Sequence, residues 1–185
     1  MAHKLDFPFP IHFVDWPTWP EHVVMHIAQA LTRWVKAFPP ASCWARVFAG
    51  LRLHLHSDLP HGALARRDAI RFHPRLFQQR PAWLAQVAVV HELAHVWAFR
   101  AKPRALAWLP IDVLAWRLVW FAWREPGPTR YGRRRWLQPS EEWAETVAAY
   151  VYPEYLDHLR RTSEPEAWLG PKHRTFVQRV YQTMC

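Results

Sequence analysis

The chain has 185 residues, of which 51% are hydrophobic and 21% charged, and it carries 13 Trp, 10 Phe and 5 Tyr. This composition excludes disorder and low complexity over most of the length and predicts one domain with a substantial core. Two cysteines, Cys43 and Cys185, are too few for a disulfide scaffold, and the start MAHKLDFPFP lacks the unbroken apolar run of a signal peptide. We therefore expect a cytoplasmic protein in a reducing compartment.

The formal net charge is +9, and the basic excess lies upstream of Glu141. Clusters such as Arg66-Arg67 and Arg133-Arg134-Arg135 suit phosphates or an acidic protein. No nucleic-acid motif accompanies them, so a solvated basic face is the favoured interpretation and nucleic acid is an unlikely partner.

The first half of the chain predicts one helix and two strands. Thr18 to Glu21 has the form of a capping box, and helical spacing of apolar residues continues until Pro39-Pro40. Alternation over 47–56 predicts a strand with His54 and His56 on its exposed face. A second short strand is expected over 68–73, with Ala69 to Phe72 at the edge of the sheet.

Two helices without internal glycine are expected next. Residues 82–102 are apolar nearly all round, which places this helix in the core. The second covers about 105–124, where Pro110, Asp112 and Arg117 argue against a membrane span. Its tryptophans recur at helical spacing and are interpreted first as core residues, with a partner-binding or peripheral membrane surface as the alternative: Trp108, Trp116, Trp120 and Trp123.

The last third predicts a loop over 125–139, a helix over 140–152 broken at Pro153, and a final helix around Phe176 to Tyr181. The predicted fold class is α+β: a small, mostly antiparallel sheet packed on an active-site helix, followed by a largely helical half. We expect one domain with an upper part of about 1–102 and a lower part of about 103–185.

The core helix contains the pattern H-E-x-x-H as His91-Glu92-Leu93-Ala94-His95. Residues four apart share one helical face, so both imidazoles can bind one ion. Glu92 is rotated by about 100° from His91, within reach of a water beside that ion without being a ligand. Charged groups in so apolar a helix need a metal or a partner, so the pattern predicts one zinc ion with Glu92 as general base.

A third ligand is expected from the helix that begins near Ser140. Glu141 is the first choice because the positive end of the helix dipole favours an ionised carboxylate there. Glu145, one turn later, is expected to accept a hydrogen bond from a ligand histidine and fix its orientation. Glu142 is expected to face solvent, although the sequence alone leaves open which of the three glutamates binds the metal.

HELAH followed by EEWAE, Glu141 to Glu145, resembles the gluzincin metallopeptidases, and most closely the group of anthrax lethal factor and Pro-Pro endopeptidase. The resemblance covers about residues 45–155. It implies a zincin-like fold, peptide hydrolysis, zinc ligands His91, His95 and Glu141, the base Glu92, and an extended substrate laid antiparallel on the preceding edge strand.

That group places an oxyanion-stabilising Tyr seven residues before the ligand Glu, where this chain has Arg134 and, three residues earlier, Tyr131. Either is a candidate for that role. A second likeness is to the ImmA/IrrE repressor-cleaving peptidases through Glu141-x-x-Ala144. A third, to SprT-like sites, rests on the segment around His173, which is expected at the surface instead.

The sequence therefore predicts a zinc-dependent peptidase acting on a peptide or protein substrate. Two other classes stay open. One is a metal-stabilised interaction or membrane-surface module without catalysis. The other is a basic nucleic-acid-associated protein or a repressor-cleaving regulatory protease.

Overall fold

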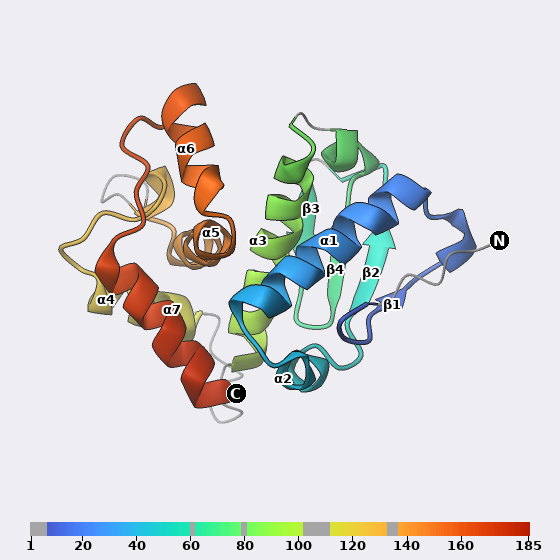
Figure 1. Ribbon diagram of the computed structural model, residues 1–185, viewed down its shortest axis with the longest axis horizontal. Coiled ribbons are helices and arrows are strands. Elements are labelled where there is room, and N and C mark those ends of the chain that lie inside the picture. The colour runs from blue at the N-terminus through green and yellow to red at the C-terminus, as the bar shows by residue number, and fades with distance from the viewer. Residues whose placement is uncertain (1–6, 60–61, 79–80, 102–111, 133–136) are drawn as a thin grey trace. The chain divides into compact units, whose positions relative to one another are not determined.

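The computed structural model describes residues 7–59, 62–78, 81–101, 112–132 and 137–185, and the chain divides into two compact units, 1–96 and 97–185 (Figure 1). The described residues form seven α-helices and one four-stranded sheet, so the predicted α+β class is confirmed. The predicted single domain, with an upper part of about 1–102 and a lower part of about 103–185, stays a prediction.

The first unit holds the sheet and three of the helices, and its elements are β1 (His12–Phe13), α1 (Glu21–Ala37), α2 (Ala41–Val47), β2 (Arg52–Leu55), β3 (Ala63–Ala65), β4 (Ala69–Phe72) and most of α3 (Trp83–Ala101). Gly50 has a φ of 69°, a left-handed conformation that turns the chain from α2 into β2. The strand predicted over 47–56 is observed only as β2, Arg52–Leu55, because Val47 is the last residue of α2.

The sheet has the order β1-β2-β4-β3, with β1, β2 and β4 parallel and β3 antiparallel to β4. The prediction of a mostly antiparallel sheet was wrong, and so was the edge position of Ala69 to Phe72. The cause is the segment after β2: it carries the chain beyond the place of β4 before turning back, so β3 becomes the edge and β4 lies inside.

The pairing of β3 determines which backbone groups remain at that edge. The His73 N–H donates to the Gly62 carbonyl, and the Arg66 N–H donates to the Ala69 carbonyl. The backbone N–H and C=O groups of the even-numbered residues in this segment therefore face β4. Ala63 and Ala65 lie between them and direct their peptide groups away from β4. The sheet thus presents a short backbone edge at β3 (Figure 1).

The core of the first unit is aromatic. Trp34, Phe38, Trp44 and Phe48 are fully buried and lie with ring centroids 5.0 to 5.8 Å apart. Burial of these rings contributes strongly to the stability of this unit, because a buried aromatic side chain removes about 150–250 Å² from water. Trp34 lies in the first predicted helix, and Phe38 is the C-cap of that helix.

Helix α1 confirms the predicted helix but not its predicted cap. Pro20 is the N-cap, and the Thr18 hydroxyl instead donates to the Asp15 carbonyl at 2.8 Å. The side chain of Gln86 on α3 donates to Gln29 on α1 at 2.6 Å, which ties these two helices together.

The second unit is helical: the end of α3, α4 (Val113–Phe121), α5 (Pro139–Val151), α6 (Pro153–Thr162) and α7 (Pro171–Met184). Helix α6 was missed, because Pro153 starts a new helix at a position where the sequence predicted only a break. Trp97, Trp143 and Phe176 pack edge to face with centroids 5.0 and 6.2 Å apart.

The prediction that the tryptophans of the segment 105–124 belong to the core was wrong for those described. Trp116, Trp120 and Trp123 have exposed fractions of 39%, 70% and 55%. Small and aliphatic residues of α4 are buried in their place: Leu114, Ala115, Leu118 and Val119. Trp108 lies outside the described residues. None of the helices in the described ranges combines the length and apolar character needed to cross a membrane.

Both cysteines of the chain are disulfide-bonded. The sequence did not predict this bond, because two cysteines are too few for a disulfide scaffold. Cys43 is buried, as expected for a small core residue. Disulfides persist in oxidising environments, so the bonded state of the two cysteines does not favour the predicted reducing compartment.

Candidate metal centre

Helix α3 carries the two histidines of the H-E-x-x-H pattern. It runs without interruption from Trp83 to Ala101, and residues 92–98 are all buried, as the apolar sequence predicted. His91 and His95, one turn apart, bring their Nε2 atoms to 3.1 Å. Two nitrogen ligands of a tetrahedral ion with bonds of about 2.0–2.1 Å lie about 3.3 Å apart, so this spacing suits a shared ion.

Glu141 is the third member of this group. His91, His95 and Glu141 each offer one ligand atom, and these atoms lie within 4.8 Å of one another. Among the described residues this is the one group of three that could hold a metal ion. Two imidazole nitrogens and one carboxylate oxygen make a donor set suited to a first-row transition metal.

The helix that carries Glu141 is fixed within the second unit. Trp143 on α5 is fully buried and packs against Trp97, the residue of α3 that lies two positions after His95. Glu141 itself is half-buried in the first turn of α5, where the helix dipole stabilises its negative charge. The aromatic contact therefore packs α5 against the part of α3 that belongs to the second unit.

Glu92 follows His91 on α3, and its side chain is only 8% exposed. It is not a member of the His91, His95 and Glu141 group. The predicted role of Glu92 as general base stays a prediction.

Glu145 lies one turn after Glu141 on α5 and is buried. It accepts a hydrogen bond from the hydroxyl of Tyr155 on α6, and burial together with the Glu145 charge raises the pKa of Tyr155. Tyr155 therefore stays a hydrogen-bond donor at neutral pH. The predicted role of Glu145 toward a ligand histidine stays a prediction.

Of the two candidates for oxyanion stabilisation, Tyr131 lies among the described residues. Tyr131 is half-buried in a short 3-10 helix (Arg130–Gly132), and the guanidinium of Arg130 lies 5.3 Å above its ring centroid. The Gln138 N–H donates to the Tyr131 carbonyl at 2.9 Å, which ties this turn to the start of α5. Arg134 lies outside the described residues.

Glu142 and His173 contradict their predicted surface positions. His173 is fully buried in the first turn of α7, and Glu142 is 3% exposed. The imidazole joins two carboxylates: Nδ1 lies 2.9 Å from Glu125 Oε1 and Nε2 lies 2.8 Å from Glu142 Oε1. Glu142 thus serves this buried triad, which leaves Glu141 as the glutamate of the metal group.

Glu125 holds the start of α7 from outside the helix. Its carboxylate accepts the backbone N–H groups of Lys172 and His173 at 3.1 and 3.2 Å. Burial opposes ionisation of this carboxyl, but the hydrogen bonds from His173 and Lys172 outweigh it and hold the pKa of Glu125 below its ordinary value. The triad is therefore a charged clamp between the loop after α4, α5 and α7.

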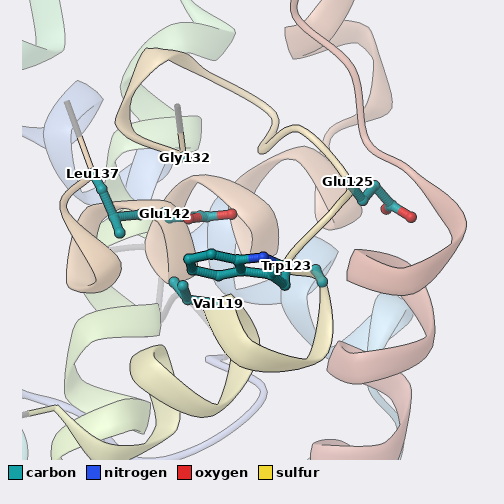
Figure 2. A pocket seen from close by; sticks show the side chains of 7 residues that line it. Val119, Trp123, Glu125, Gly132, Leu137 and Glu142 are labelled. Atoms are coloured by element: carbon teal, nitrogen blue, oxygen red, sulfur yellow. The ribbon is translucent and has the colours of Figure 1, made fainter. Parts of the chain in front are cut away.

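Close backbone packing seals the triad. A Cβ atom on Gly127 or Gly132 would lie 2.9 or 2.8 Å from Glu142 Oε1, so only glycine lets this loop approach the carboxylate. A small pocket of about 40 Å³ remains beside it, and Figure 2 shows the Trp123 ring next to the Glu142 side chain there. This pocket has room for water and not for a peptide side chain.

The sequence indicated the helix that carries His173 but not the two glutamates that contact it. Gly170-Pro171 marked a helix start just before His173, which is where a buried polar side chain can meet an acidic partner. Neither Glu125, in the predicted loop, nor Glu142 could be assigned to it, because both contacts join residues more than 30 positions away.

The metal group makes a direct prediction. Replacing His91 or His95 with alanine is expected to weaken Zn²⁺ binding at least about 100-fold, since even loss of an outer partner costs 10–100-fold. His54→Ala, a half-exposed histidine on β2, is the matched control and keeps wild-type affinity. Metal content after dialysis against buffered zinc checks both. Unchanged stoichiometry in the α3 variants would exclude this group as a metal site.

Comparisons with known proteins add no relative: no family model, no curated protein and no solved structure matches the chain.

Proposed function

We propose that this protein is a zinc-dependent peptidase of the gluzincin type. The observation that carries the proposal is the spacing of His91 and His95 on α3, with Nε2 atoms 3.1 Å apart and a Glu141 oxygen close enough to complete the donor set. Three protein ligands leave a fourth position for chemistry, which is typical of catalytic and not of structural zinc sites.

His91, His95 and Glu141 would hold the ion, and Glu92 would move the proton. Bound zinc supplies a Lewis acid that polarises the scissile carbonyl and eases deprotonation of water. The Glu92 carboxylate accepts the proton of the attacking water and passes it to the departing amine. Tyr131 and Arg134 remain the candidates to donate a hydrogen bond to the oxyanion.

The sheet supports an extended substrate at β3. In the group that this chain resembles, the substrate lies antiparallel on the edge strand before the active-site helix. Here that edge strand is β3, where the half-buried Ala63 directs its N–H and C=O groups away from β4 and Ala65 does so from a buried position. Such an edge pairs with a substrate backbone irrespective of sequence, so side-chain selectivity has to come from the surrounding loops.

The proposal is tested by mapping new N-termini in a proteome digest with three preparations of the protein: zinc-loaded, stripped of metal, and stripped then reloaded. We expect cleavages that appear with zinc, vanish on stripping and return on reloading. Identical N-termini from all three, at confirmed metal contents, would overturn the proposal and favour a structural metal.

A further inference from the structure

Helix α4 has two faces of opposite character. Leu114, Ala115, Leu118 and Val119 are buried, and this side of the helix packs against α5 and α7. On the other side of the helix and in the turn that follows it, every exposed side chain from Trp116 to Arg124 is Trp, Phe or Arg: Trp116, Arg117, Trp120, Phe121, Trp123 and Arg124. We call these six residues the aromatic-basic face.

The aromatic-basic face is ordered by one contact between its own rings and by contacts of Phe121 with α7, where Phe176 lies with its ring centroid 5.7 Å from that of Phe121. Trp120 and Trp123 stack with centroids 5.8 Å apart and an interplanar angle of 18°. The guanidinium of Arg179 on α7 lies 5.2 Å above the Phe121 ring. Exposed aromatic residues that cluster in this way are typical of a contact site, whereas single surface tryptophans need no explanation.

The hydrogen-bonding capacity of this face is one-sided. Indole N–H and guanidinium groups only donate, and Phe121 does neither, so none of the six side chains offers a conventional acceptor. A complementary partner must therefore present acceptors over a broad apolar surface. Phosphate and ester oxygens above acyl chains have this chemistry, whereas a protein surface also carries N–H donors.

The segment that forms this face contains no acidic residue of its own. No Asp or Glu occurs between Val113 and Arg124. The two carboxylates that flank the segment bond inward: Asp112 accepts from the Ala115 N–H at 3.0 Å, and Glu125 accepts from His173 and Lys172. Arg117, Arg124 and Arg179 are all exposed.

We propose that the aromatic-basic face of α4 is a docking surface for an anionic phospholipid membrane. The tryptophans would sit at headgroup depth with their rings toward the acyl chains, and the arginines would bind lipid phosphates. The inference does not depend on the proposed function, since it needs neither metal nor catalysis.

Co-sedimentation with vesicles tests it. Wild type is expected to bind vesicles of phosphatidylcholine with 30% phosphatidylglycerol and to stay in solution with phosphatidylcholine alone. Arg117→Gln/Arg124→Gln is expected to bind about thirtyfold more weakly, since each arginine near an anionic surface contributes about fivefold, or ~1 kcal/mol. Trp120→Ala/Trp123→Ala is expected to lose at least about tenfold.

The matched control is Trp16→Ala, an exposed tryptophan of the first unit (49% exposed), which should bind as wild type does. Far-UV circular dichroism verifies that each variant is folded. Metal-stripped protein should bind vesicles equally well. Wild type that remains in solution with anionic vesicles, or a Trp120→Ala/Trp123→Ala variant that binds unchanged, overturns the proposal. A dimer that this double substitution dissociates, without vesicle binding, assigns the face to self-association instead.

Discussion

Glu92→Gln is expected to lower peptide hydrolysis by about 10² to 10⁴-fold while leaving one metal ion bound per chain. The substitution keeps the volume of the side chain but removes the carboxylate that accepts the proton of water. Glu92 is outside the His91, His95 and Glu141 group, so metal affinity should be retained. The measurement is turnover of a substrate found in the digest, normalised to metal content.

The matched control for this result is Glu21→Gln, the same chemical change at an exposed position of α1. It should retain turnover within a factor of two, because nothing in the first turn of α1 belongs to the metal group. If Glu92→Gln keeps wild-type turnover with a full complement of metal, Glu92 is not the base. If it loses its metal instead, the carboxylate has a structural role toward the ligands.

His173→Ala is expected to destabilise the fold by about 3–5 kcal/mol. Removing the imidazole leaves the side chains of Glu125 and Glu142 buried without the polar group that both contact. Lys172→Ala is the matched control, since this exposed neighbour contributes only its backbone N–H to Glu125 and should change stability by less than about 0.5 kcal/mol. Denaturant unfolding measures both.

A further test of the triad uses acid. Because the pKa of Glu125 is depressed in the folded protein, its contribution to stability is present above the unfolded pKa of about 4.3 and is lost as pH falls through the folded value. The His173→Ala variant should therefore show a shallower loss of stability below about pH 4. A change below about 1 kcal/mol in neutral unfolding, with an unaltered acid profile, would show that the triad is dispensable.

What the sequence predicted well depends on local pattern. The limits of α3 and α5 came within one or two residues because proline and apolar spacing act over a few positions. The pair His91 and His95 is likewise a property of one helix, so its geometry could be predicted before any tertiary contact was known.

What it predicted badly depends on contacts between distant segments. The place of β3 at the sheet edge is decided by the path of the chain after β2, which periodicity does not encode. The burial of His173 and Glu142 follows from their contact with each other and with Glu125, and each of these residues alone is typical of a surface. The exposure of Trp120 shows the reverse error, since an amphipathic pattern cannot say which face is left uncovered.

The edge strand β3 also bears on the behaviour of the protein at high concentration. An uncovered edge invites strand-to-strand aggregation between copies, and natural proteins limit this with short edges and flanking charge. Here the edge comprises three residues, and Arg66 and Arg67 follow it directly and are exposed. Two copies that approached through this edge would bring four like charges together, whereas a single extended peptide would meet no such repulsion. Substituting Arg66 and Arg67 with neutral residues would therefore be expected to promote aggregation through β3.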